Sequence, residues 1–129
     1  MREIKFRGKR LDNGEWEYGD LVHTTNDVLI LPTDKGWEQY KVDPETVGQY
    51  IGIKDRDGKE IWEGDIVMVG SRDEEYDEIV KGFPFLIMFN YVGFCIAEDD
   101  MSPWGLISNL DWLEVIGNIH DNPELLKGE

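Results

Sequence analysis

Short stretches in which apolar and polar residues alternate recur along the chain. Residues 3–7 (EIKFR) place Ile4 and Phe6 on one face and three charged residues on the other. Residues 15–18 (EWEY) alternate in the same way, and a period of two is typical of a half-buried strand. Residues 12–14 (DNG) lie between the two stretches and favour a tight turn, because Asn and Gly accept a positive φ. The pattern therefore predicts an N-terminal β-hairpin, which residues 19–20 (GD) end.

The remaining apolar runs are short, and turn residues bound them. Residues 43–45 (DPE) and 122–126 (NPELL) each combine a capping side chain, a Pro at the first helical position and a Glu, so both predict very short helices. Residues 70–79 (GSRDEEYDEI) are rich in acids and predict a solvated loop, and residues 101–109 predict an irregular segment. Extended segments are predicted at residues 21–23, 28–31, 50–53, 61–62, 64–69, 85–89, 94–97 and 113–119.

Two segments resemble each other within the chain. Residues 13–22 (NGEWEYGDLV) and 57–67 (DGKEIWEGDIV) each run from a turn through an aromatic strand and a Gly-Asp corner to an aliphatic strand. The shared pattern is short, and it predicts two similar hairpins rather than a duplication.

Eight or more short strands with one-turn helices are typical of a barrel or of two packed sheets. We expect a single all-β domain over residues 1–129, with an N-terminal β-hairpin region over about 1–47. A small SH3-like barrel should follow over about 48–121, where residues 64–67 (GDIV) resemble the corner that opens such barrels. A short C-terminal helix should cover about 122–128.

Composition adds a strong negative charge to this picture. The 129 residues hold 13 basic and 28 acidic side chains, which gives a net charge of −15, and five of the basic residues lie in the first ten positions. From Leu11 onward the net charge is −19. A field of that sign repels phosphate backbones, so direct nucleic-acid binding is disfavoured, and only the basic N-terminal strand keeps it open. The excess acid favours solubility.

Compartment and membrane signals are few. Residues 1–10 are charged and lead into no apolar segment, so we expect no signal peptide. The apolar stretch from Phe83 to Ala97 is shorter than the roughly 20 residues of a membrane helix, so no membrane association is expected. The single Cys95 cannot form an internal disulfide and is predicted to be a buried, inert thiol. This cysteine usage fits a reducing cytoplasm.

Candidate metal and catalytic residues have simpler structural explanations. Residues 55–60 (DRDGKE) resemble part of a calcium loop, but alignment puts Ile53 and Gly64 at two essential ligand positions, so a hairpin turn is favoured. Asp65 is expected to bond backbone N–H groups two residues on. His23 and His120 lie 97 positions apart without metal-ligand spacing. We therefore predict no catalytic, metal or cofactor residues and no cofactor.

The five tryptophans are many for this length, and most are expected in the core. Trp104, between Pro103 and Gly105 in an expected loop, is the one predicted to be exposed, and a structural role is favoured over a binding role.

Three segments are similar to one known family. They are residues 1–7 (MREIKFR), 52–67 (GIKDRDGKEIWEGDIV) and 114–126 (EVIGNIHDNPELL), and the central one is the most specific. The chain resembles the YopX family of phage and prophage proteins, although residues 70–112 match weakly. The resemblance implies a β-rich phage or prophage protein acting in a bacterial cytoplasm, and it supplies no catalytic residues.

Three functions from different classes remain open. The favoured one is a non-enzymatic protein-interaction or regulatory factor with a protein partner. The alternatives are an acidic DNA mimic that antagonises a host nucleic-acid-binding protein, and a metal-dependent enzyme with dispersed carboxylates. A homo-oligomer is also predicted, because the hairpin from Phe83 to Ala97 is apolar on both faces. The competing view is that residues 104–107 cover this hairpin within one chain.

Overall fold

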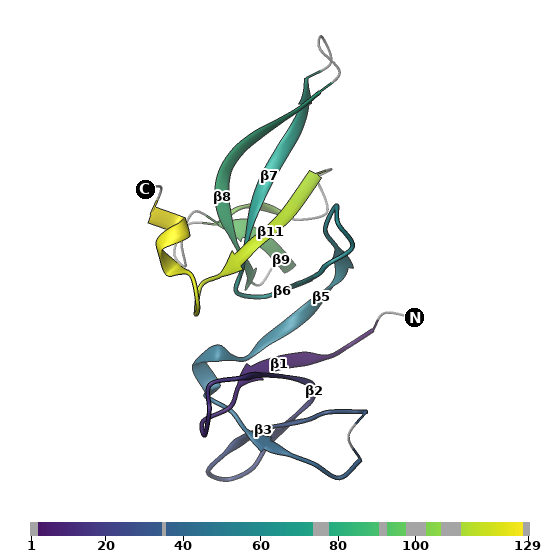
Figure 1. Cartoon of the computed structure of the whole chain (residues 1–129), viewed down its shortest axis with the longest axis vertical. Helices are drawn as coiled ribbons and strands as arrows, with labels where there is room; N and C mark the ends of the chain where they lie inside the picture. Colours follow the sequence, from purple (N-terminus) through teal and green to yellow (C-terminus); the bar gives the residue numbers. More distant parts are fainter. Residues whose placement is uncertain are drawn as a thin grey trace. The chain divides into compact units, whose positions relative to one another are not determined.

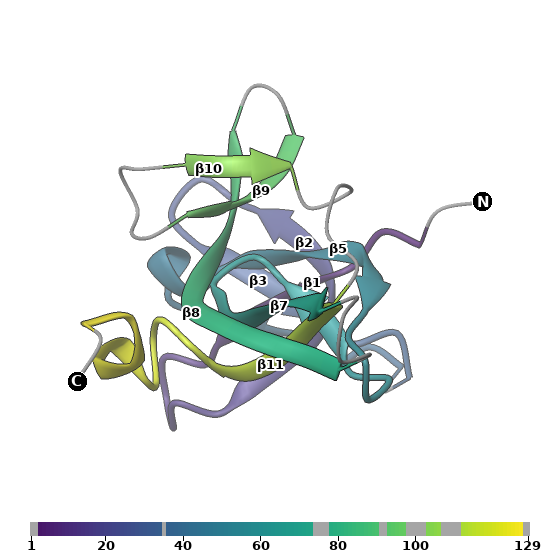
Figure 2. The same cartoon turned by 90° about the horizontal axis from the view of Figure 1, so that it is seen from above.

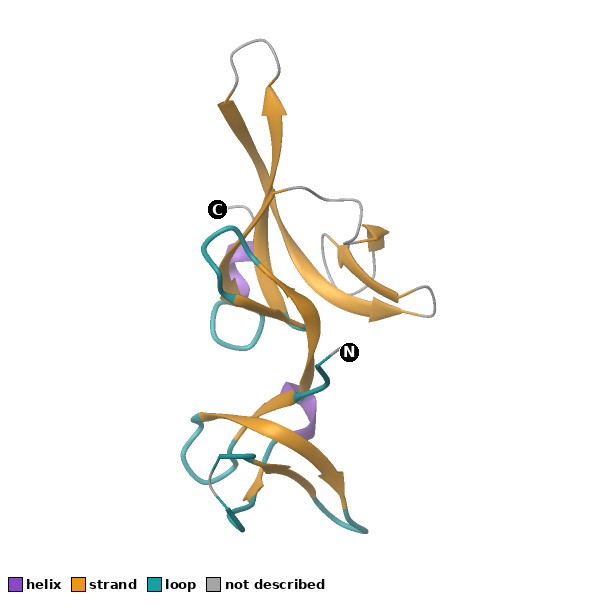
Figure 3. Cartoon of the chain, turned by 90° about the vertical axis from the view of Figure 1, so that its right-hand side faces the viewer, coloured by secondary structure: helices purple, strands orange, loops and turns teal. Residues whose placement is uncertain are grey.

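The computed structural model describes residues 3–34, 36–73, 78–90, 93–97, 103–106 and 112–127. Its backbone contacts divide into two compact units, Met1–Gly52 and Ile53–Glu129 (Figure 1). Each unit is built almost entirely of antiparallel β-strands (Figure 3), so the predicted all-β class is confirmed. The prediction of one domain over residues 1–129 stays a prediction.

A curved antiparallel sheet forms the first unit. Its strand order is β4-β3-β2-β1-β5, and β6 is the next strand after β5 in this order. Two hydrogen bonds also link the chain around the end of β1 to the chain around β4: Leu11 N–H donates to Lys41 O (3.0 Å) and Asp43 N–H donates to Lys9 O (2.8 Å). The elements are β1 (Phe6–Lys9), β2 (Trp16–His23), β3 (Val28–Leu31), β4 (Tyr40–Lys41), the 3-10 helix η1 (Pro44–Thr46) and β5 (Gly48–Lys54).

The predicted N-terminal hairpin is present, but the face that it buries differs from the prediction. Ile4 lies before β1 and is 61% exposed, whereas Arg7 is only 6% exposed. In β2 the buried positions are Glu17 and Gly19, and Tyr18 points to solvent. The alternation pattern predicts the hairpin, but β1 begins at Phe6 instead of residue 3, and the buried faces differ from the expected ones.

Another antiparallel sheet forms the second unit, with the strand order β10-β9-β8-β7-β11. Strands β9 and β10 lie side by side at one edge (Figure 2), and β7 and β8 form a long twisted hairpin. The elements are β6 (Glu60–Trp62), β7 (Asp65–Asp73), β8 (Glu78–Asn90), β9 (Gly93–Ala97), β10 (Pro103–Leu106), β11 (Trp112–Asn118) and the 3-10 helix η3 (Pro123–Lys127).

Buried side chains gather in both units. In the first unit Ile30 and Val42 are almost completely buried, and Gly8 leaves room for Val42, since a Cβ on Gly8 would lie 2.9 Å from Val42 Cγ2. In the second unit, Phe85, Leu86 and Ile87 are consecutive and all buried. Because neighbouring strand residues point to opposite faces, β8 is covered on both faces at these positions.

The predicted SH3-like barrel over about 48–121 is not formed. The two sheets are not closed into a barrel, and among the described strands β10 and β11 remain at opposite edges of their sheet. Many short strands and tight turns are common to barrels and open sheets, so this feature of the sequence does not distinguish them.

The two predicted irregular segments contain strands. Strand β7 runs to Asp73 and β8 begins at Glu78, with Asp73 opposite Glu78, so the loop predicted over 70–79 is wrong at both ends. Paired backbone groups stabilise this hairpin in spite of the like charges of Asp73 and Glu78. The segment predicted to be irregular over 101–109 contains β10, which pairs with β9. The rest of both segments lies outside the described residues.

The two Gly-Asp corners differ in structure. Gly19 lies inside β2 (φ +157°), where a Cβ would meet Leu31 O at 2.2 Å, so the strand continues and the predicted break is absent. Gly64 forms the turn between β6 and β7 with φ +89°. Its N–H donates to Ile87 O (2.9 Å) and its carbonyl accepts from Ile119 N–H (2.8 Å). The internal resemblance therefore does not indicate two similar hairpins.

Both short helices are confirmed. Asp43 caps η1, because its Oδ1 accepts from Glu45 N–H (3.0 Å), and Pro44 occupies the first helical position. Helix η3 begins at Pro123 as expected. Among the described residues there is no helix long and apolar enough to cross a membrane.

The Gly64 turn yields a test of the fold. Gly64→Val should lower the free energy of unfolding by at least about 1–2 kcal/mol, because a β-branched residue is strained at positive φ. Gly64→Asn is the matched control and should lose less, since Asn tolerates positive φ. Urea denaturation of the three proteins measures this, and equal midpoints for Gly64→Val and wild type would contradict the role of this turn.

Candidate functional site

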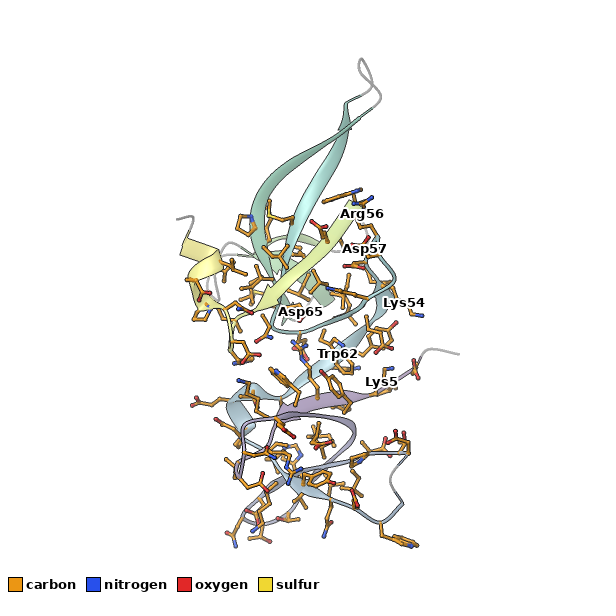
Figure 4. The ribbon with its side chains drawn as sticks, in the orientation of Figure 1. Lys5, Lys54, Arg56, Asp57, Trp62 and Asp65 are labelled. Atoms are coloured by element: carbon orange, nitrogen blue, oxygen red, sulfur yellow. The ribbon has the colours of Figure 1, made fainter. Side chains whose placement is uncertain are left out.

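Asp55 is a turn-forming residue in the structure. Its Oδ1 accepts from the N–H groups of Asp57 (2.8 Å) and Lys59 (2.9 Å), and its Oδ2 accepts from Val115 N–H (2.9 Å). Figure 4 shows the next two residues of the turn, Arg56 and Asp57, beside β11. The carboxylate thus closes the β5–β6 turn and fastens it to β11.

The ionisation of Asp55 follows from this environment. Burial raises the pKa of the carboxyl, but the hydrogen bonds from Val115, Lys59 and Asp57 together outweigh it and hold the pKa below its ordinary value. Both carboxylate oxygens are used by backbone N–H groups. The predicted hairpin turn at residues 55–58 is confirmed, with Gly58 at φ +86°.

Asp65 also has a structural role, although its partner differs from the prediction. The side chain is almost fully buried, and its Oδ2 accepts from Trp62 N–H (2.8 Å), three residues earlier instead of two residues later. Asp65 is the first residue of β7, and its side chain binds the last residue of β6, Trp62 (Figure 4).

The other residues weighed for chemistry come from different segments of the chain. His23 ends β2 in the first unit, and His120 follows β11 in the second. Cys95 lies in β9 and Trp104 in β10, and both side chains are outside the described part of the structure. Among the described residues, no group of three or more His, Cys, Asp or Glu could hold a metal ion.

The cations of the basic N-terminal strand lie over aromatic rings. The Arg7 guanidinium is 4.5 Å from the centre of a Trp16 ring, and Lys9 Nζ is 5.6 Å from it. Lys5 Nζ lies 5.0 Å from the centre of the Tyr50 ring. Cation–π contacts of this kind stabilise both partners. These side chains therefore contribute to the packing of the first unit.

Arg10 connects the β1–β2 hairpin to β4. Its Nε and Nη2 donate to the two carboxylate oxygens of Asp12 (2.9 and 2.7 Å), and its Nη1 donates to Glu17 (3.4 Å). The guanidinium also stacks on Tyr40, 4.1 Å from the ring centre. The hydrogen bonds with Asp12 raise the pKa of Arg10 and lower that of Asp12.

An open cavity of about 300 Å³ lies beside β4, next to this cluster. Leu11 contributes an exposed apolar side chain to it, and Tyr40 contributes an aromatic one. The Tyr40 hydroxyl donates to Glu38, and this hydrogen bond raises the pKa of Tyr40. The lining residues, which we call the β4 groove, are Arg10, Leu11, Asp12, Gln39, Tyr40 and Lys41.

Trp37 lies close to the β4 groove in sequence, in the segment between β3 and β4. Its side chain is fully exposed, unlike those of Trp62 and Trp112, which are buried. Trp37 was not among the predicted exposed residues, since Trp104 was expected to be the exposed tryptophan. A signal was present, because Trp37 directly follows the turn-forming residues 33–36 (TDKG) and precedes the polar residues Glu38 and Gln39.

The family assignment now has both sequence and structural support. The family model described as "YopX protein" matches residues 5–127. The chain belongs to the YopX family. No curated protein matches it. Among solved structures it is similar to protein EF1440 from Enterococcus faecalis, with a TM-score of 0.59 and 25% sequence identity over 98% of this chain and 99% of that chain.

Two of the three segments that resemble the YopX family carry turns and caps in the structure. Residues 52–67 contain the buried Asp55 and Asp65 and the positive-φ Gly64. In residues 114–126, Asn118 Oδ1 accepts from the N–H groups of His120 (3.0 Å) and Asp121 (2.9 Å). The roles of these residues are architectural, and the β4 groove and Trp37 lie outside the quoted segments.

Asp55 gives a stability test with a pH signature. In Asp55→Asn the amide nitrogen would replace one acceptor, so a backbone N–H that Asp55 now binds loses its partner. We expect a loss of about 2–3 kcal/mol in the free energy of unfolding at neutral pH. Asp57→Asn, at an exposed position of the same turn, is the control and should stay within about 0.5 kcal/mol of wild type.

The difference between wild type and Asp55→Asn should shrink in acid. The folded pKa of Asp55 lies below its unfolded value of about 3.9, so its stabilisation is complete above that pH and lost as pH falls through the folded pKa. Urea denaturation at neutral and acidic pH measures this. A difference that does not depend on pH would contradict an ionised Asp55 in the folded protein.

Proposed function

We propose that this YopX-family chain is a non-enzymatic protein-interaction or regulatory factor of a phage or prophage, acting in the bacterial cytoplasm. The observation that supports it is Trp37, fully exposed between β3 and β4 and two residues from the β4 groove. Tryptophan is enriched among the residues that dominate binding energy at protein interfaces. The indole of Trp37 contributes no burial energy while it is exposed to water. A partner that covers the ring would therefore gain this energy on binding.

The buried carboxylates favour this proposal over an enzyme. The buried acids among the described residues are Glu17, Asp55 and Asp65. Glu17 accepts a hydrogen bond from Arg10, and the two aspartates bind backbone N–H groups within their own unit. A general acid, general base or metal ligand needs oxygens directed at a substrate or ion. The hypothesis of a metal-dependent enzyme with dispersed carboxylates therefore gains no residues from the described part of the chain.

A DNA mimic is the second candidate, and the distribution of charge favours it. The first unit holds 7 basic and 10 acidic residues, a net charge of −3, whereas the second holds 6 basic and 18 acidic residues, a net of −12. A strongly acidic unit attracts the cationic surface of a nucleic-acid-binding protein.

Affinity capture from a nuclease-treated bacterial lysate tests the proposal. Wild type should retain specific proteins that Trp37→Ser loses. The matched control is Ile4→Ser, which removes another exposed apolar side chain of the first unit and should retain them. Captured proteins that are unaffected by Trp37→Ser and that bind nucleic acid would favour the DNA mimic instead. If the three baits capture the same proteins and none binds nucleic acid, the interaction role of Trp37 is wrong.

Homo-oligomerisation remains a prediction, and the structure bears on its argument. The hairpin from Phe83 to Ala97 is buried on both faces at residues 85–87, and Ile96 is buried as well. An apolar patch left for a second copy must therefore lie elsewhere on the hairpin. Light scattering at micromolar concentration and moderate salt should give a mass above the 15.0 kDa of one chain. A mass near 15.0 kDa would overturn the oligomer.

A further inference from the structure

Cation–aromatic contacts recur in this protein. Arg7 and Lys9 lie over Trp16, and Arg10 lies over Tyr40. In the second unit the Arg56 guanidinium lies 5.1 Å from the centre of the Trp112 ring. Each of these rings has a cation of the same chain over its face.

Trp37 differs from these rings because its side chain is fully exposed. Both faces of the indole are therefore open to solvent. Of the aromatic side chains, indole binds a cation over its face most strongly. A ring in this state can accept a cation from another molecule in the way that Tyr40 accepts Arg10.

The charges around Trp37 favour a cation. Asp34 and Glu38 are exposed on either side of it, and Lys35 is the one basic residue of the same segment. In the β4 groove, the two cations are already engaged: Arg10 by Asp12 and Glu17, and Lys41 by Asp27, 3.6 Å away. The groove, the segment 33–39 and the residues paired with them therefore hold more acidic than basic side chains. The whole chain carries a net charge of −15. This field attracts basic partners and repels acidic ones.

We propose that Trp37 binds an arginine or lysine side chain of a basic partner protein, through a cation–π contact that Asp34 and Glu38 reinforce. The exposed Leu11 in the neighbouring groove would accept an apolar side chain of the same partner segment. The inference rests on the proposed function, because it assigns a partner class to the same surface.

The test uses two synthetic peptides that differ in charge alone. One alternates Arg with Leu, and the other replaces each Arg by citrulline, which has nearly the same shape but no charge. Isothermal titration at moderate salt measures the affinity of each peptide for the full-length protein. Trp37→Leu keeps an apolar side chain and the net charge but removes the ring, and Trp37→Phe restores an aromatic face.

Wild type should bind the Arg peptide more tightly than the citrulline peptide. Trp37→Leu should weaken binding of the Arg peptide by about 5- to 30-fold, which corresponds to a partly or fully desolvated cation–π contact, and Trp37→Phe should recover part of this loss. Glu38→Gln should weaken binding of the Arg peptide more at low salt than at high salt, because salt screens the attraction between the carboxylate and the peptide.

Three results would overturn the inference. If wild type and Trp37→Leu bind the Arg peptide equally, the affinity comes from net charge alone. If neither peptide binds, the surface does not accept basic segments. If binding depends on Trp37 but is equal for both peptides, the ring does not bind a cation, although the interaction role of Trp37 would still hold. Failure of that role is decided separately, by the capture experiment with Trp37→Ser and Ile4→Ser.

Discussion

The second unit depends on a buried carboxylate that accepts hydrogen bonds from backbone N–H groups. Asp55 binds two N–H groups in its own turn and one on β11, so a single side chain fixes both a turn and a contact 60 residues away in sequence. Hydrogen bonds to a charged acceptor are stronger than neutral ones, and losing the acceptor would leave buried N–H groups without partners. Asp65 repeats the principle at the β6–β7 turn. The most specific family segment, residues 52–67, contains both residues and thereby specifies how this part of the chain turns.

Element type and position could be predicted from the sequence wherever local chemistry decides them. The DPE and NPELL segments begin helices because capping and the fixed φ of proline act within a few residues. The buried faces could not be predicted in the same way. Arg7 is buried because Trp16 on the neighbouring strand lies under its guanidinium, and Glu17 is buried with Arg10 beside it. These partners come from the strand register, and an alternation pattern read along one strand cannot include them.

The acidic residues gave a wrong prediction in one segment and a correct one in another. Residues 70–73 and 78–79 extend β7 and β8 in spite of their polar and charged side chains, because the two strands satisfy each other's backbone groups. By contrast, the missing ligand positions alone were enough to reject a calcium loop at residues 55–60. In the structure the Asp55 side chain stabilises a turn through its own hydrogen bonds. Charge counts describe the field around a protein well and its backbone path poorly.

Because Trp37 is exposed, its contribution to binding can be tested without changing the stability of the fold. Burying a tryptophan removes about 150–250 Å² of surface from water, which at about 25 cal/mol per Å² contributes roughly 4–6 kcal/mol. Trp62, which is buried, contributes on this scale to the second unit, whereas Trp37 contributes almost nothing to the first. Substitutions at Trp37 therefore leave the free energy of unfolding nearly unchanged while removing the largest exposed aromatic surface among the described residues. A loss of binding in such a variant can then be attributed to the surface itself, which is not true of any substitution at Asp55 or Gly64.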